Sequence, residues 1–147
     1  MTQTNRKSPL STSSLNCQPR IGPCDEPRIF TLAQANALMP LLRSITRRAH
    51  QSLQAARNEF DPTTPATVQS RAIEATYQAI VERWVAKMER LGVIVKGLWL
   101  LDFDTGDGYL CWKYPEATIF HYHEYGEDFS QRRHLLEVIR ETTPDWA

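Results

Sequence analysis

The sequence lacks any long hydrophobic run, and this absence limits where the protein can act. No apolar stretch approaches the roughly 20 residues that a membrane-spanning helix needs. The opening segment, MTQTNRKSPLSTSSLN, has no hydrophobic stretch of the kind found in secretory signals, although its serine and threonine content also suits an organellar transit peptide. We expect a solvated N-terminal tail and a cytoplasmic protein that does not bind membranes.

Cysteine is scarce, with three residues in a chain of 147. An odd number is not a disulfide framework, and Cys17 and Cys24 both fall in the N-terminal segment. We interpret these two as free thiols, because no further metal ligands lie near them. The cysteine usage predicts a reducing compartment, which agrees with a cytoplasmic location.

The common catalytic motifs are absent. The chain has no glycine-rich phosphate loop, metalloprotease helix motif, paired CxxC or nucleophile elbow. The segment DTGDG predicts a turn, and the aspartates around it lack the twelfth-position glutamate of a calcium loop. The sequence therefore favours a protein that is not an enzyme and carries no cofactor.

The chain also lacks an excess of one charge, since 17 basic and 17 acidic residues cancel. No overall field attracts nucleic acid, and an acidic C-terminal half would repel phosphates. Basic residues dominate residues 28–60, whereas acidic residues dominate residues 92–130. This asymmetry favours charge complementarity, either within one chain or between subunits.

The first structural pattern that the sequence contains is helical. Thr31 and Gln34 have the spacing of a capping box, and Pro40 predicts a kink or a short separate first segment. Apolar residues then recur at steps of three and four, which is typical of an amphipathic helix. This stripe consists of Leu38, Leu42, Ile45, Ala49, Leu53, Ala56 and Phe60.

A second helix is predicted after the break DPTTP, with Thr64 as its cap and Pro65 in its first turn. Gly92 is placed to end it. Its apolar stripe consists of Ile73, Tyr77, Ile80, Trp84, Met88 and Leu91. Residues 31–91 therefore predict an antiparallel helical hairpin, whose long amphipathic faces suit coiled-coil packing.

From Val93 the apolar period changes to that of strands. The segments VIVKGLWLLDFD, YLCWK and IFHYHEY, separated by the turns DTGDG and YPEAT, predict a three-stranded antiparallel meander over residues 93–125. A C-terminal helix, capped by Ser130, is predicted over residues 130–141. We expect an α+β fold in which the hairpin packs on the meander, forming one domain over residues 28–147 behind a disordered tail of residues 1–27.

The turn lengths determine which residues share a face of the sheet. A turn at residues 104–107 places Asp102 opposite Tyr109. A five-residue YPEAT turn pairs Leu110 with Tyr122, whereas a four-residue turn would bury two histidines at a cost of about 1–3 kcal/mol each. We choose the five-residue turn, which gives one apolar face against the helices: Trp99, Leu101, Phe103, Leu110, Trp112, Phe120 and Tyr122.

The opposite face is the candidate binding face, formed by Asp102, Tyr109, Cys111, His121 and His123. The two histidines lie on one side of a strand, about 7 Å apart at the backbone. With Cys111 across from His121, the residues Cys111, His121 and His123 are candidate ligands for a divalent metal such as zinc. Three alternatives stay open: a Cys/His nucleophile pair, a ligand or partner surface, and a buried cysteine beside partly solvated histidines.

Three segments resemble a known family: FTLAQANALMPLL, GLWLLDFDTGDGYLCWKYPE and HEYGEDFSQR. Over residues 28–132 the chain is similar to an uncharacterised bacterial family, domain of unknown function number two-two-zero-three. The resemblance implies a family but no activity. The matching residues are Thr31, Ala35, Asn36, Pro40, Gly97, Leu98, Asp102, Phe103, Cys111, Trp112, Glu116, His123, Phe129 and Arg132.

The resemblance also bears on the candidate site. His121 falls outside the family pattern, which leaves Asp102, Cys111 and His123 as the stronger trio. The family has glycines where this chain has Asp128 and Gln131, so the loop after the last strand is expected to differ here.

Two functions of different classes follow from the sequence. The first is a small interaction or scaffold protein that self-associates through its helices or binds a protein partner. It depends on the two amphipathic helices and on the absence of a complete catalytic constellation. The alternative is a metal- or small-ligand-binding protein that uses the polar face of the sheet.

Overall fold

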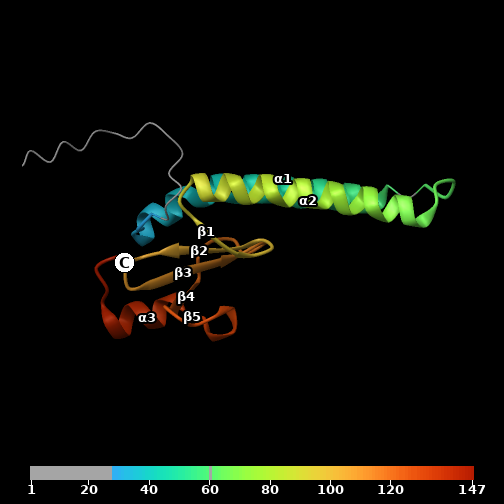
Figure 1. Ribbon diagram of the computed structural model, residues 1–147. Helices are drawn as coiled ribbons and strands as arrows, with labels where there is room; N and C mark the ends of the chain where they lie inside the picture. Colours follow the sequence, from blue (N-terminus) through green and yellow to red (C-terminus); the bar gives the residue numbers. More distant parts are fainter. Residues whose placement is uncertain (1–27, 60) are drawn as a thin grey trace, which may run out of the picture.

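The computed structural model describes residues 28–59 and 61–147, so the predicted tail of residues 1–27, with Cys17 and Cys24, and Phe60 lie outside the described residues. Figure 1 shows a hairpin of two long helices, a sheet below part of it, and a C-terminal layer beneath the sheet. The α+β class is therefore confirmed. The elements are α1 (Leu32–Asn58), α2 (Ala66–Arg90), β1 (Ile94–Gly97), β2 (Leu100–Asp104), β3 (Gly108–Lys113), β4 (His121–Glu124), η1 (Phe129–Gln131), β5 (Arg133–His134) and α3 (Leu135–Thr142).

Helix α1 begins at the predicted capping box. The Gln34 N–H donates to Thr31 Oγ1 (3.2 Å), and the Thr31 N–H donates to Gln34 Oε1 (3.0 Å). Pro40 lies inside one continuous helix, and Figure 1 shows the first turns at an angle to the rest. The predicted kink is therefore present, and no separate first segment splits off.

Helix α2 ends as predicted but begins differently. Gly92, at φ 78°, terminates the helix in the left-handed region that favours glycine, and the Arg28 side chain occupies the space where a Cβ would stand. The predicted Thr64 cap is wrong: the Thr64 hydroxyl donates to Asp61 Oδ2 (2.9 Å), and the N-cap residue is Pro65. The Asp61 carboxylate also binds Thr63, so it organises the turn between the helices rather than the helix end.

The sheet has five antiparallel strands in the order β1-β2-β3-β4-β5, which corrects the predicted three. The predicted first strand folds back on itself after Gly97 to give β1 and β2, with Trp99 at φ 61° in the connection. A tryptophan at positive φ is uncommon, so tertiary packing must hold this turn. The Trp99 ring packs edge-on against Trp84 of α2 at 4.9 Å between centroids.

The registers agree with the predicted faces. Leu110 pairs with Tyr122 and Cys111 with His121, as the five-residue YPEAT turn requires. In the first hairpin, however, Asp102 pairs with Cys111 and not with Tyr109. Thr105 and Gly108 close the turn: the Thr105 hydroxyl accepts from the Gly108 N–H (3.1 Å), and the Thr105 N–H donates to the Gly108 carbonyl (2.9 Å). The resulting shift of two residues leaves the paired side chains of this hairpin on their predicted faces.

The main core lies between the hairpin and the sheet. It includes Leu42, Trp84, Met88, Leu101, Phe103, Leu110 and Trp112, all of them buried. The Trp84 indole N–H donates to Thr46 Oγ1 (3.0 Å), which satisfies its polar atom inside this core. The prediction that Phe120 lies in the core is wrong, because its side chain is 41% exposed. Strand β4 starts only at His121, and Ile119 is buried in place of Phe120.

The C-terminal layer differs from the single predicted helix. Residues 129–142 form η1, the short edge strand β5 and α3. Ser130 does not cap a long helix; its backbone N–H donates to Asp128 Oδ1 (2.8 Å), and Asp128 caps η1. The N-cap residue of α3 is His134. The loop that contains η1 lies against the polar face of the sheet, since Glu127, Asp128 and Phe129 share a cavity with Cys111 and His123.

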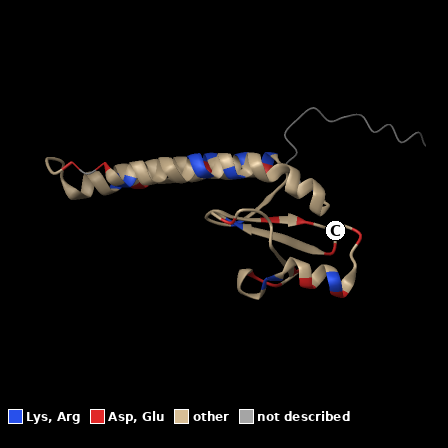
Figure 2. Cartoon of the chain, turned by 180° about the vertical axis from the view of Figure 1, so that it is seen from behind, with Lys and Arg blue, Asp and Glu red and all other residues tan. Residues whose placement is uncertain are grey.

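Charge is distributed over the layers as the sequence predicts. Figure 2 shows mainly basic residues along the hairpin, with a few acidic ones, and both charges in the sheet, the loops and α3. The ion pairs among the described residues all lie within the sheet and the C-terminal layer. In the same residues, none of the helices has the length and apolar character needed to cross a bilayer.

Candidate functional site

Three side chains from three strands meet on the polar face of the sheet. Asp102 on β2 pairs directly with Cys111 on β3, and His123 comes from β4. One ligand atom from each residue lies within 4.8 Å of the other two. The small Cys111 side chain lets the His123 ring reach past β3 to Asp102, two strands away. The three residues form what we call the trio.

The His123 ring is held from both sides. Its Nδ1 lies 3.1 Å from the Glu124 carbonyl oxygen, and its Nε2 lies 2.9 Å from Asp102 Oδ2. A carbonyl oxygen only accepts, so Nδ1 carries the proton and donates it there. Nε2 is thereby directed at the carboxyl group, and one proton must lie between these two atoms to give the hydrogen bond. The site therefore has an imidazole nitrogen fixed in position and aimed at its neighbours.

All three side chains are buried, at 1% exposed for Asp102 and Cys111 and 3% for His123. Burial raises the pKa of the Asp102 carboxyl, and the nearby His123 opposes the rise. Burial and the charge of Asp102 raise the pKa of the Cys111 thiol to about 12, although Arg132 lowers it somewhat. Cys111 is therefore a protonated thiol near neutral pH, which argues against the predicted Cys/His nucleophile pair.

One oxygen of the trio has no partner. Asp102 Oδ1 is buried and makes no hydrogen bond within the described part of the chain. An unsatisfied buried carboxylate oxygen costs about 1–3 kcal/mol, and more if it is charged. The Asp102 carboxyl group also interacts with the Cys111 thiol, so Oδ1 is the spare acceptor of the trio.

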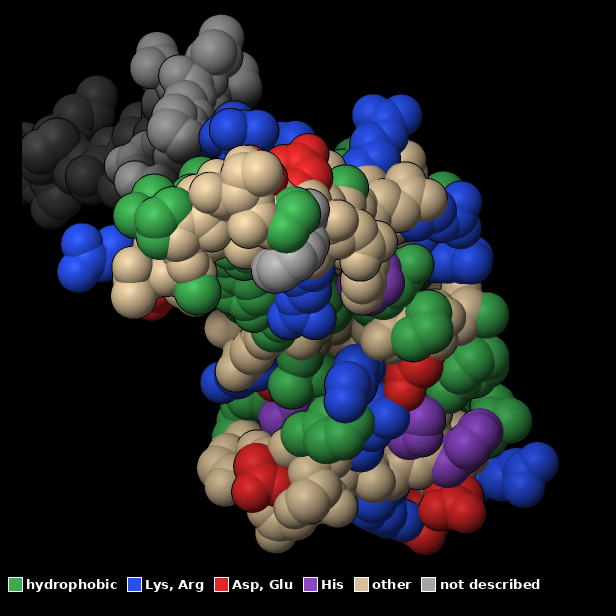
Figure 3. Space-filling view, turned by 90° about the vertical axis from the view of Figure 1, so that its right-hand side faces the viewer, with side chains coloured by type: hydrophobic (Ala, Val, Ile, Leu, Met, Phe, Trp, Pro, Cys, Tyr) green, Lys and Arg blue, Asp and Glu red, His purple; other side chains and the backbone are tan. Residues whose placement is uncertain are grey.

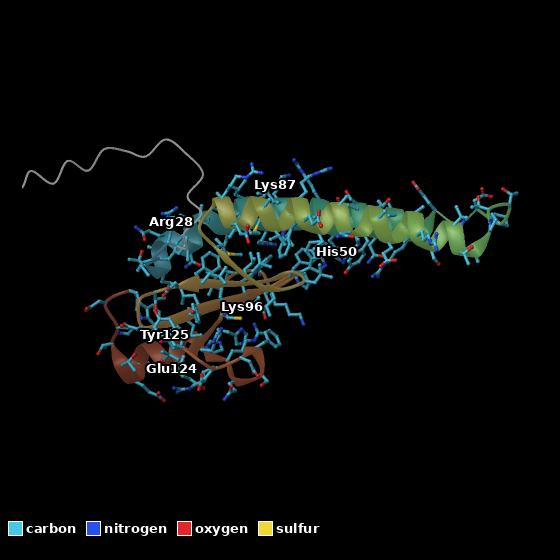
Figure 4. The ribbon with its side chains drawn as sticks, in the orientation of Figure 1. Arg28, His50, Lys87, Lys96, Glu124 and Tyr125 are labelled. Atoms are coloured by element: carbon cyan, nitrogen blue, oxygen red, sulfur yellow. The ribbon has the colours of Figure 1, made fainter. Side chains whose placement is uncertain are left out.

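The trio faces a cavity of about 280 Å³. Its lining residues are Lys96, Leu100, Asp102, Cys111, His123, Glu127, Asp128 and Phe129. In Figure 3, histidine, basic and hydrophobic side chains gather in the sheet layer below the end of the hairpin. Figure 4 places Lys96 in this sheet layer, while His50 extends from α1 to the top of the sheet. Asp102 and Cys111 alternate along their strands with Leu101, Leu110 and Trp112, which pack toward the hairpin. The cavity therefore lies on the side of the sheet away from the hairpin.

The remaining candidates of the binding face lie beside the trio. His121 pairs with Cys111 as predicted, but its Nδ1 points toward Glu116, 3.7 Å from Oε1. Burial, with the charge of Arg132, lowers the pKa of His121. The Tyr109 ring packs against the His123 ring at a tilt of 44°, 5.3 Å between centroids, and the Lys96 ammonium lies over the Tyr109 ring. The structure therefore brings Asp102, Cys111 and His123 together and leaves His121 and Tyr109 as neighbours.

Several residues of the site were not singled out from the sequence as site residues. Lys96 enters the cavity from the edge strand β1, which the sequence did not separate from β2. Glu127 and Phe129 come from a loop, whose path no periodicity predicts. Arg132 holds Glu116 through a 2.6 Å ion pair and lies 4.1 Å above the Phe129 ring. Phe129 and Arg132 were matched in the family pattern, which was the one signal available for them.

The donor set defines what the trio can do chemically. A carboxylate, a thiolate and an imidazole are the ligands of borderline-soft divalent ions, zinc above all. The same groups without an ion form a buried hydrogen-bonded pair beside an inert thiol. Metal binding stays a prediction, and its candidate ligand atoms are those of Asp102, Cys111 and His123.

Comparison with known proteins identifies the chain at the family level. The family model described as Uncharacterized conserved protein (DUF2203) matches residues 28–135. Neither a curated protein nor a solved structure gives a significant match. The match spans the hairpin, the sheet and the loop over the trio, and it confirms the resemblance seen in the sequence. The chain therefore belongs to the family of the Uncharacterized conserved protein (DUF2203).

Proposed function

We propose that the protein binds one divalent transition-metal ion, preferentially zinc, through Asp102, Cys111 and His123. The observation that carries this proposal is the convergence of three buried donor atoms within 4.8 Å. Zinc at its usual bond lengths of about 2.0–2.3 Å holds tetrahedral ligands about 3.5 Å apart. The separation of His123 Nε2 and Asp102 Oδ2, 2.9 Å, lies below that value, and the limit of 4.8 Å lies above it. Small side-chain rotations therefore suffice to seat the ion.

The surroundings of the trio support a metal site. Metal-binding histidines usually donate their other ring N–H to a carbonyl or a carboxylate, as His123 does to the Glu124 carbonyl. The ion would replace the proton between Nε2 and Asp102 Oδ2, and the thiol proton of Cys111. The second carboxylate oxygen, Oδ1, has no hydrogen-bond partner among the described residues and could complete the carboxylate contact.

Three protein ligands would leave one coordination position of the ion open for water or a small molecule. Structural zinc sites have four protein ligands, whereas sites with three protein ligands keep the fourth position for water or a ligand. The trio supplies three and borders a cavity of about 280 Å³. An ion bound there would act as a Lewis acid on a molecule in the cavity.

Zinc titration tests the proposal. The Cys17→Ser/Cys24→Ser chain serves as background, so that Cys111 is the only thiol. Calorimetry is expected to give one zinc per chain, with affinity reduced at least about 100-fold by Cys111→Ser or His123→Ala. His121→Ala is the matched control, since His121 is the same residue type on the same face of β4 but outside the trio. Folded protein that binds no zinc, or binds it equally well in all these variants, would refute the proposal.

Self-association through the hairpin is a second role, favoured by a separate observation. Figure 1 shows the hairpin extending well past the sheet, so the outer part of α1 and α2 packs only helix against helix. Val68, on this part of α2, is an exposed large hydrophobic residue. The basic hairpin makes no ion pair with the acidic sheet among the described residues, so charge complementarity remains for a second copy. Light scattering at two concentrations tests this role, and a strict monomer at high concentration would exclude it.

A further inference from the structure

The cavity over the trio has two poles of opposite charge. Lys96 enters it from β1, at one edge of the sheet. Glu127 and Asp128 enter it from the loop after β4, which lies three strands away in the sheet order. The floor between the poles is formed by Asp102 and Cys111 on the two middle strands. The lining therefore presents a cation on one side and carboxylates on the other.

The cationic pole is positioned and available. The Lys96 ammonium lies 5.1 Å above the centre of the Tyr109 ring, which orients it without neutralising it. Lys96 makes no ion pair within residues 28–59 and 61–147. The charge of Lys96 also acts on the Asp102 carboxyl group, whose pKa it lowers, and a ligand carboxylate in the cavity would give Lys96 a direct partner.

The anionic pole is held in place by its own loop. One oxygen of Glu127 accepts the Glu124 N–H (3.0 Å), and one oxygen of Asp128 accepts the Ser130 N–H (2.8 Å). The same Ser130 contacts lower the pKa of Asp128, so it stays ionised. Glu127 and Asp128 therefore bring two negative charges to this side of the cavity, which favours an ammonium group there.

Two apolar side chains complete the cavity, Leu100 and Phe129. Phe129 is held from two directions, with Lys113 at 4.9 Å and Arg132 at 4.1 Å from the ring centre. Its ring is therefore a fixed wall rather than a loose cover. Together with the buried Asp102 carboxyl group, these side chains make the cavity a lined chamber with apolar walls and charged groups.

We propose that this chamber binds a small zwitterion of the free amino acid class that carries an apolar side chain. The ligand carboxylate takes the open position of the metal and pairs with Lys96, its ammonium group lies between Glu127 and Asp128, and its side chain contacts Leu100 and Phe129. This inference rests on the proposed metal site, because the ion and Lys96 share the carboxylate. The mixed charge of the lining excludes a simple anion or a simple cation as the preferred occupant.

Three matched probes test the inference on the zinc-loaded protein. L-Leucine carries both charges, 4-methylpentanoate lacks the amine, and 3-methylbutylamine lacks the carboxylate. Calorimetry is expected to show L-leucine binding at least about tenfold more tightly than either partial probe. Lys96→Met, Glu127→Gln and Asp128→Asn are each expected to weaken L-leucine at least about tenfold while the protein still binds one zinc per chain. The two amide variants keep the carbonyl oxygen that accepts the loop N–H groups.

The outcomes separate the two proposals. Zinc binding with no preference for L-leucine over the partial probes would overturn the zwitterion site and leave the metal site standing. A preference for L-leucine that Lys96→Met does not change would also overturn it. Failure of zinc to bind the folded protein would overturn both proposals.

Discussion

His123 Nε2 lies 2.9 Å from Asp102 Oδ2, with both side chains buried beneath the loop that contains η1. The Nδ1–H of the same ring is donated to the Glu124 carbonyl, so the orientation of the imidazole is fixed by the backbone of its own strand. This pair can contribute to the stability of the fold, to zinc binding, or to both, and substitutions can separate the two contributions.

Asp102→Asn should preserve the fold and lose the metal. The asparagine amide can donate to His123 Nε2 in place of the shared proton, so we expect unfolding free energy within about 1 kcal/mol of wild type. The neutral amide is a poor zinc ligand, and zinc affinity should fall at least about 100-fold. Urea denaturation and zinc calorimetry on the same preparation measure the two effects.

His123→Ala provides the contrast to that variant. It removes one member of a buried pair and leaves the Asp102 carboxyl without its partner, which should cost about 3–5 kcal/mol of stability. A loss below about 1 kcal/mol in urea denaturation would show that the pair contributes little to the fold.

Cys111 should resist alkylation in the folded protein. Because its pKa is raised to about 12, the fraction of reactive thiolate is very small at pH 8 and rises about tenfold per unit as the pH increases toward the pKa. Iodoacetamide labelling of the Cys17→Ser/Cys24→Ser chain, followed by mass spectrometry, is expected to be slow natively and fast in urea. Equal rates in both conditions would contradict the buried, protonated thiol.

Thr46→Val should destabilise the hairpin–sheet core. The valine fills nearly the same space but leaves the buried Trp84 indole N–H without its acceptor, at a cost of about 1–3 kcal/mol. Thr46→Ser keeps the hydroxyl and serves as the control. If urea denaturation gives the two variants equal stability, the hydrogen bond does not contribute.

Gly108→Ala should destabilise β3 where the sheet passes closest to Tyr122. A Cβ at this position would collide with the Tyr122 phenol and lie 2.9 Å from the His123 carbonyl oxygen. We expect a loss of about 2 kcal/mol or more, since the backbone cannot move aside. Gly126→Ala is the comparison, because nothing lies within 4 Å of the Cβ that the alanine would add. Only the positive φ of 80° at this position should lower the stability, by about 1 kcal/mol. Equal losses in thermal denaturation would argue against the close contact.

The faces of the sheet could be predicted because side chains alternate and because one register would have buried two histidines. That argument placed Cys111, His121 and His123 on one side, and the pairing of Leu110 with Tyr122 confirms it. The reversal between β1 and β2 could not be found in this way. Gly97 precedes the turn, but the residue at positive φ is Trp99 rather than a glycine or asparagine, so the local signal is weak, and packing against Trp84 fixes the turn.

The periodicity of the sequence also could not predict that the loop after β4 packs over the polar face of the sheet. The sequence left open a buried Cys111 beside partly solvated histidines; Cys111 is indeed only 1% exposed, but His123 is buried as well, at 3%. The loop that contributes Glu127, Asp128 and Phe129 has no repeating pattern, and its path depends on tertiary contacts such as the Arg132–Glu116 ion pair. The trio was therefore predictable by residue type, but its chamber was not.

Cobalt substitution tests the metal site most directly, because it reports the ligand atoms as well as binding. With Cys111 as the only cysteine, adding one equivalent of Co²⁺ is expected to give an intense four-coordinate visible spectrum and a thiolate-to-cobalt charge-transfer band. Both features should disappear in Cys111→Ser and persist in His121→Ala. A pale six-coordinate spectrum without the charge-transfer band, in folded wild-type protein, would contradict the proposed site at Asp102, Cys111 and His123.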